Sequence, residues 1–207
     1  MGILAAAGAA VLFAIAYAML RAGRFDPLER IAAWARTRGL EYVAPASHQA
    51  LATFVGDVDG LQVEVTVARV ARGFGNDLPT RLTTVTAGFG GDGFGGAPVC
   101  ALQPAAWVLD RDGREVGERV PSGDPDFDAM WSARGADADA QRRVLSPQLR
   151  SRLLEPDVEG LIIEVTNGGV TIPMPGVCSD ALELDRRVAV AIALARVLRL
   201  PDRRIDG

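Results

Sequence analysis

Alternating apolar and polar positions mark the clearest strand of the chain. From 61 to 67 the odd positions are Leu or Val and the even positions are Gln, Glu and Thr, which is the period of a strand with one buried face. Asp59-Gly60 precedes this run and favours a two-residue hairpin turn from the apolar run 51–55. Further extended stretches are predicted at 40–43, 81–89 and 98–109, the last returned by a turn at 112–113.

A second hairpin is predicted near the end of the chain. Asn167-Gly168 separates the apolar runs 161–165 and 170–172, and Pro173 and Pro175 are expected to end the second run. Ser179 is then expected to cap a long helix, 180–198, whose wide apolar face packs across the sheet. Because hairpins rather than βαβ units dominate, the sequence predicts an α+β fold with an antiparallel, hairpin-rich sheet packed by a long C-terminal helix.

The first twenty residues predict a transmembrane helix. They carry no charged side chain, and as a helix they would span about 30 Å, the thickness of a bilayer core. Five arginines follow the span and none precedes it, so the positive-inside rule predicts a single-pass inner-membrane anchor with the domain in the cytoplasm. A cleaved signal peptide is the alternative, because 16–18 reads Ala-Tyr-Ala, although basic residues before Ile3 are missing. A buried core helix is a third reading.

The chain therefore divides into a transmembrane anchor (1–21), a juxtamembrane amphipathic helix (22–39), an α+β domain (40–200) and a polar tail (201–207). The juxtamembrane helix is predicted to start at Asp26-Pro27 and to end at Gly39, with Leu28, Ile31 and Ala35 on one face. Its arginines are expected either to lie on anionic headgroups or to be solvated.

The stretch from Ser122 to Leu154 combines an acidic turn with helix-start signals. Gly123-Asp124-Pro125 predicts a turn, and alternation from Phe127 to Ser132 predicts a strand that buries Phe127 and Trp131. A helix is expected at 136–145, and Ser146-Pro147 restarts it with an apolar stripe at Leu149, Leu153 and Leu154.

Asp124, Asp126 and Asp128 form the candidate functional turn. Their spacing matches the first half of a calcium loop, but Ala129 stands where such a loop needs Gly and Gly135 where it needs Glu. We interpret the turn as structural, with its carboxylates bonding backbone amides or pairing with Arg134 or Arg152. We assign no catalytic residue, no cofactor-binding residue and no metal ligand.

Composition excludes several chemistries. The net charge is −4 and every one of the 22 basic residues is Arg, so no Schiff-base or Walker lysine exists, and no basic excess favours a nucleic-acid partner.

The glycine-rich stretch 88–96 is interpreted as a flexible loop. Its Gly88, Gly90 and Gly93 match the spacing of a dinucleotide loop, but no helix is predicted to follow them. The single His48 accompanies no G-x-S-x-G elbow. Cys100 and Cys178 are expected to be buried free thiols, with a disulfide as the alternative.

Several of these pieces together resemble a bacterial family of membrane-anchored proteins whose domain has no assigned function. They are Gly-Asp-x-x-Phe-Asp at 123–128, Leu-Ser-Pro at 145–147, Arg-Leu-Leu at 152–154, an Ile/Val hairpin and an apolar C-terminal helix. The resemblance covers about 34–198. It implies a membrane anchor and a β-rich domain, and it supplies no catalytic residues.

The function expected from these features is that of a membrane-anchored interaction or scaffold domain. Its partners would be the bilayer, through residues 1–21, and an unknown protein, with no cofactor. The alternatives are a domain that binds a small ligand or lipid between sheet and helix, and an enzyme in which Asp124, Asp126 or Asp128 works with Arg134 or Arg152.

Overall fold

The computed structural model describes residues 26–45, 47–70, 80–88, 100–105, 121–134, 142 and 144–199. The predicted span 1–21, most of the glycine-rich loop 88–96, the turn at 112–113, most of the helix 136–145 and the tail 201–207 lie outside the described residues. Among the described residues, no helix has the length and apolar character needed to cross a membrane.

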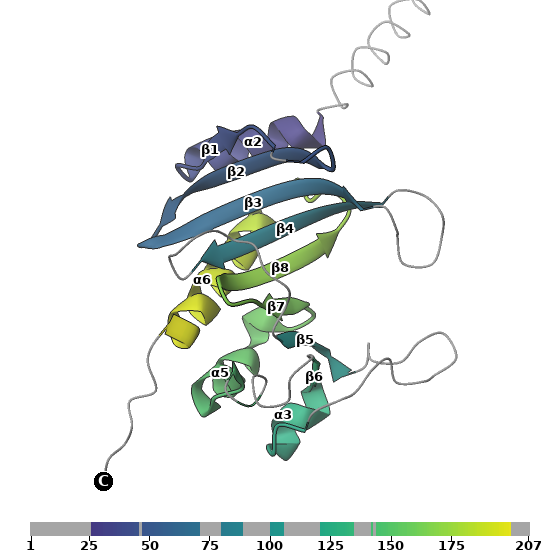
Figure 1. Cartoon of the computed structure of the whole chain (residues 1–207), viewed down its shortest axis with the longest axis vertical. Coiled ribbons are helices and arrows are strands. Elements are labelled where there is room, and N and C mark those ends of the chain that lie inside the picture. The colour runs from purple at the N-terminus through teal and green to yellow at the C-terminus, as the bar shows by residue number, and fades with distance from the viewer. Residues whose placement is uncertain are drawn as a thin grey trace, which may run out of the picture.

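One sheet organises the described part of the chain (Figure 1). Its eight strands are all paired antiparallel, in the order β1-β2-β3-β4-β8-β7-β5-β6. This confirms the predicted antiparallel α+β class. The strands are β1 (Glu41–Val43), β2 (Ala50–Val58), β3 (Leu61–Val70), β4 (Thr80–Gly88), β5 (Cys100–Pro104), β6 (Trp131–Arg134), β7 (Ile163–Val165) and β8 (Gly169–Pro175).

Both predicted hairpins are present. Asp59 and Gly60 join β2 to β3 with φ values of 55° and 77°, a conformation that Gly adopts without steric cost. The four apolar side chains of β3 that alternation placed on one face, at 61, 63, 65 and 67, are at most 3% exposed. The second hairpin pairs β7 with β8 through Val165 and Val170.

Helices pack on one face of this sheet. α2 (Pro27–Thr37) contacts β1 and β2, and α6 (Ala181–Arg199) contacts β3, β4 and β8. α2 buries Ile31 and Ala35 completely and leaves Trp34 only 7% exposed. These side chains belong to the same hydrophobic core as the sheet. The helix predicted within 22–39 is therefore part of the domain's core.

Three helix starts share one sequence signature, a capping side chain followed by Pro. Asp26 accepts a hydrogen bond from the Leu28 amide at the start of α2, as predicted. Ser146 accepts one from the Leu149 amide at the start of α5 (Pro147–Leu153), also as predicted. Leu149 and Leu153 are each 1% exposed, which confirms the apolar stripe.

The third start corrects the sequence interpretation. The strand predicted from Phe127 to Ser132 is wrong, because Pro125–Met130 forms a helix, α3, and the strand β6 begins only at Trp131. Asp124 caps this helix and Pro125 occupies its first turn, so the signals read as a turn are those of a helix start. Phe127 and Trp131 are nevertheless buried, at 0% and 2% exposure, as predicted.

Two boundaries also differ from the prediction. The cap of α6 is Asp180 rather than Ser179, since the Asp180 carboxylate accepts from the Leu182 and Glu183 amides. Strand β8 does not end at Ile172 but continues through Pro173 to Pro175. Its ladder with β7 stops at Thr171, so the missing amide of Pro173 costs no hydrogen bond on that side.

Candidate functional site

The acidic turn is built from backbone contacts. Asp124 Oδ1 accepts from the amides of Asp126 and Phe127, each at 3.2 Å, so its carboxylate is an N-cap. Arg150, from α5, lies beside it, with Nε 3.6 Å from Asp124 Oδ2 and Nη1 donating to the Ser122 carbonyl at 3.0 Å. The cation therefore fixes α5 against the loop that enters α3.

Asp128 closes the same loop from the other side. Both of its carboxylate oxygens accept from the Ser122 amide, at 3.0 and 3.2 Å. The structure thus brings Asp124 and Asp128 together around Ser122, whereas Asp126 is exposed. A carboxylate that accepts backbone amides stabilises the loop it belongs to. These contacts support a structural role for Asp124 and Asp128.

Arg152 contacts a different part of the chain. Its guanidinium donates to both oxygens of Asp157, at 2.7 and 2.6 Å, and lies 3.1 Å from Glu155. This bidentate bond holds the pKa of Asp157 below its ordinary value of 3.8. Arg152 therefore joins α5 to the 3-10 helix Pro156–Val158 rather than to the acidic turn.

His48 and the acidic turn lie far apart in the described part of the chain. His48 is exposed in the turn before β2, near one end of the sheet, while α3 contacts β6 at the other end. Burial raises the pKa of the Cys100 thiol to about 11, so it is a poor nucleophile at neutral pH. Both cysteines are free, and Cys178 is only half-buried. Within the described residues no group of three His, Cys, Asp or Glu side chains is placed to hold a metal ion.

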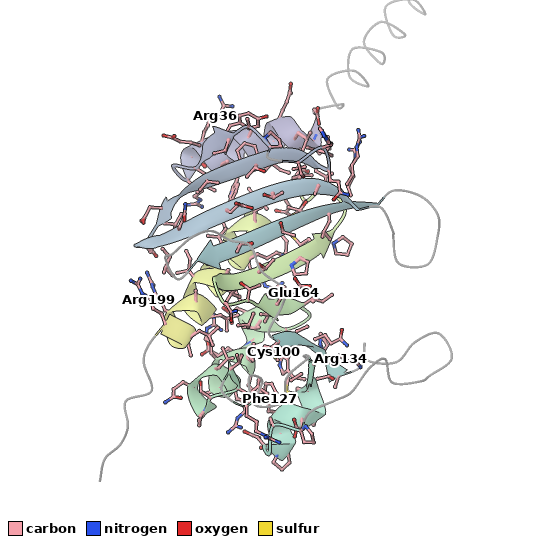
Figure 2. The ribbon with its side chains drawn as sticks, viewed as in Figure 1. Arg36, Cys100, Phe127, Arg134, Glu164 and Arg199 are labelled. Carbon is pink, nitrogen blue, oxygen red and sulfur yellow. The ribbon has the colours of Figure 1, made fainter. Side chains whose placement is uncertain are left out.

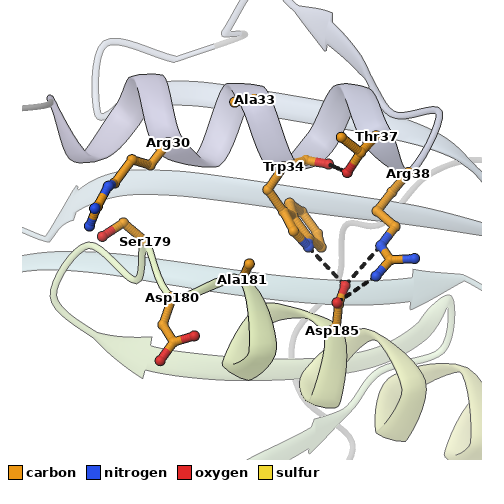
Figure 3. A pocket seen from close by; sticks show the side chains of 9 residues that line it. All are labelled: Arg30, Ala33, Trp34, Thr37, Arg38, Ser179, Asp180, Ala181 and Asp185. Atoms are coloured by element: carbon orange, nitrogen blue, oxygen red, sulfur yellow. Dashed lines mark hydrogen bonds and ion pairs between the residues drawn. The ribbon is translucent and has the colours of Figure 1, made fainter.

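A groove separates α2 from the start of α6 (Figure 3). It has a volume of about 720 Å³ and is lined by nine residues, among them Arg30, Ala33 and Ala181. Trp34 Nε1 donates to Asp185 Oδ1 at 2.8 Å, and Arg38 Nε donates to the same oxygen at 2.9 Å. Trp34, Arg38 and Asp185 thus join the two helices, and Arg30, Ser179 and Asp180 are further polar residues that line the groove.

We call the face of the sheet opposite α2 and α6 the open face. Directly paired residues of an antiparallel sheet project from one side. One row crosses all eight strands, formed in order by Glu41, Val55, Glu64, Thr86, Thr171, Glu164, Ala101 and Arg134. A second row is formed by Val43, Thr53, Thr66, Thr84 and Pro173.

Threonine hydroxyls connect neighbouring strands on the open face. Thr66 Oγ1 lies 3.3 Å from Thr53 Oγ1 and donates to Glu64 Oε1 at 2.9 Å. Thr86 and Thr171 share a hydrogen bond of 3.1 Å. Asp57 lies on the same face, paired with Gln62, and accepts the Gly60 amide. The open face is therefore polar and ordered, and its described charges are mainly carboxylates.

Glu164 is the unusual member of the row. It projects from β7 between the buried Ile163 and Val165, and Figure 2 shows it in the part of the sheet that leads to Arg134. Burial raises the pKa of Glu164 above its ordinary value of 4.5. Its carboxylate has no hydrogen-bond or ion-pair partner among the described residues. An unpaired, half-buried carboxylate lowers the stability of the folded state, so we expect replacement of Glu164 to change that stability.

Sequence reasoning missed two of these features. It assigned no role to Asp185, although the residue lies one position after Leu184 in a predicted apolar helix. It also passed over Glu164, whose position between Ile163 and Val165 in a predicted hairpin was a usable signal. The polar side of β3 was recognised, but its alignment with other strands required the register.

The chain matches no protein-family model and no curated protein. A solved structure that is similar is the crystal structure of the mycobacterial trehalose monomycolate transport factor A, with a TM-score of 0.53 and 16% sequence identity. The similarity covers 86% of this chain and 98% of that one. At this level of identity, the likeness shows a shared fold.

Proposed function

We propose that this chain is a membrane-anchored, non-enzymatic interaction domain that serves as an accessory factor of a membrane transport system. The observation that carries the proposal is the open face, because α2 and α6 pack on the other side of an eight-stranded sheet. A broad, polar sheet face suits a protein partner, whereas small ligands bind in concave, largely apolar sites.

The fold likeness supports the transport part of the proposal. The similar structure is named as a transport factor, and nearly its whole length is matched. A factor of this kind would act by binding a component that carries out transport. Asp124 and Asp128 of the acidic turn accept hydrogen bonds from backbone amides, and this supports a non-enzymatic role for these two carboxylates.

Residues 1–21 would hold the domain at the membrane. Residues 1–20 of this segment are uncharged and long enough to span a bilayer, and the arginines at 21, 24, 30, 36 and 38 all follow them. This distribution favours a cytoplasmic domain. A single cysteine introduced at exposed Ala33, in a chain with Cys100 and Cys178 replaced by Ser, should resist a membrane-impermeant maleimide in intact cells. Ready labelling there would contradict the cytoplasmic side.

Co-purification tests the function directly. The full chain with a C-terminal affinity tag would be crosslinked in intact cells, purified in detergent and analysed by mass spectrometry. We expect a complex with a polytopic membrane protein, and we expect the complex to be lost when residues 1–21 are deleted. Recovery of an uncomplexed chain that carries a tightly bound lipid would instead favour the ligand-binding alternative.

A further inference from the structure

We infer that the open face is the docking surface for a basic segment of the partner, of the kind found in the Lys/Arg-rich cytoplasmic loops of integral membrane proteins. The inference rests on the proposed function and names the surface and the chemistry of the partner. Its basis is a group of carboxylates that the strand register places on one side of β1, β2 and β3.

Three carboxylates lie close together on this part of the open face. Glu41 and Glu64 flank Val55 in one row, and Asp57 lies two residues further along β2. Glu41 and Asp57 are exposed and Glu64 is half-buried. None of the three forms an ion pair with a described residue.

Cations of the same strands are placed elsewhere. Arg69 and Arg81 are opposite one another in the ladder between β3 and β4. They alternate with the open-face positions and so project from the same side as the buried residues of these strands. Arg134, the cation of the eight-residue row, lies on the last strand of the sheet, at the end opposite β1. The β1–β3 part of the open face is thus acidic, while exposed cations of α2 belong to the other side.

Apolar side chains accompany the carboxylates. Val43, on the edge strand β1, is 46% exposed, and Val55 is half-buried between Glu41 and Glu64. A surface with carboxylates around apolar groups matches arginine and lysine, whose stems pack on apolar atoms while their charged ends pair. This mixture favours a peptide segment over a free cation.

The same charge argues against other occupants. Nucleic acid and the cytoplasmic leaflet are both negative and would be repelled by the three carboxylates. Cytoplasmic loops of membrane proteins carry an excess of Lys and Arg. A domain held at the cytoplasmic surface by residues 1–21 would meet such loops at high local concentration.

Two variants test the inference, and in each of them neutral amides replace three carboxylates. The open-face variant is Glu41→Gln, Asp57→Asn and Glu64→Gln, which keeps acceptor oxygens for the Gly60 amide and for Thr66. The control is Glu29→Gln, Asp126→Asn and Glu159→Gln, at exposed sites outside the sheet. Each variant removes three carboxylates, so both change the net charge from −4 to −1.

A fluorescent nona-arginine peptide is the probe for the purified full chain in non-ionic detergent. We expect the open-face variant to bind it about tenfold more weakly than the wild type, because three ion pairs at a solvated surface each contribute about twofold. We expect the control to lose less than about twofold. Equal losses in the two variants would overturn the inference, since overall charge rather than the open face would then govern binding.

The in-cell complex separates this inference from the proposed function. Co-purification of a membrane protein with the wild type and the control, but about tenfold less with the open-face variant, supports both. Equal recovery with all three chains leaves the proposed function standing and overturns the docking surface. Crosslinked peptides from a segment without Lys or Arg, or from a second copy of this chain, overturn the basic partner. Absence of any complex contradicts the proposed function itself.

Discussion

The indole Nε1 of Trp34 donates a 2.8 Å hydrogen bond to Oδ1 of Asp185, and so joins the first described helix to the last. Arg38 donates to the same carboxylate from the end of α2. Partial burial opposes the charge on Asp185, but these donors outweigh it and hold the pKa of Asp185 below its ordinary value of 3.8. α2 is thereby tied to the domain rather than left as a separate segment.

Trp34→Phe should destabilise the purified full chain by about 1 kcal/mol, because it removes the hydrogen bond and keeps most of the packing. Denaturant titration would measure this. Tyr42→Phe is the control, since the Tyr42 side chain is 62% exposed and should change stability by less than about 0.5 kcal/mol. Stability contributed by ionised Asp185 should be present above pH 3.8 and lost as the pH falls through its lowered pKa. Equal effects of the two variants would mean that the indole bond contributes nothing.

Phe127→Ala should cost about 3–5 kcal/mol, because the ring is fully buried and its removal leaves a cavity under α3. Met130→Ala, in the same helix at a side chain that is 51% exposed, should cost less than about 1 kcal/mol. The two unfolding curves, compared at one temperature, check this. Similar small losses would place Phe127 outside the core.

Asp128→Asn should lower the free energy of unfolding by about 1–2 kcal/mol, since the Ser122 amide then bonds a neutral acceptor in place of a carboxylate. Asp126→Asn, in the same turn but exposed, should change it by less than about 0.5 kcal/mol. Added calcium should leave the melting temperature of the wild type unchanged. A calcium-dependent rise that disappears in Asp128→Asn would restore the metal interpretation.

Glu164→Gln should stabilise the chain at neutral pH. The folded-state pKa is raised above 4.5, so the folded state binds the proton more tightly than the unfolded state does. The wild type therefore loses stability as the pH rises from 4.5 through the folded pKa. The advantage of the variant should be full above that pKa and should vanish below 4.5, when the melting temperature is followed against pH. Glu159→Gln is the exposed control and should show no such pH dependence.

Strands and turns were predictable where a local pattern determines them. The buried side of β3, the turn at Asp59-Gly60 and the caps at Asp26 and Ser146 depend on neighbours in sequence, and each was found. Asp124-Pro125 has the same cap-and-proline form, yet a strand was predicted after it. The alternation of Phe127 and Trp131 competed with that signal, and the six-residue helix α3 is too short to show a helical period.

The candidate surfaces depend on register between distant segments, which no local pattern encodes. Glu41, Glu64 and Glu164 belong to three strands that are 23 and 100 residues apart in sequence, and only the pairing places them in one row. Asp185 likewise lies 151 residues from Trp34. The acidic turn was recognised from sequence because Asp124 and Asp128 bond to groups within six residues.

Photocrosslinking from two positions tests the central claim most directly. A benzophenone amino acid would replace Gln62, which is exposed on the open face, or Leu182, which is 80% exposed on α6. Irradiation of intact cells that express the full chain should give, from position 62 alone, an adduct with an integral membrane protein. Adducts only with lipid, or no protein adduct from either position, would contradict a membrane-anchored domain that binds its partner through the open face.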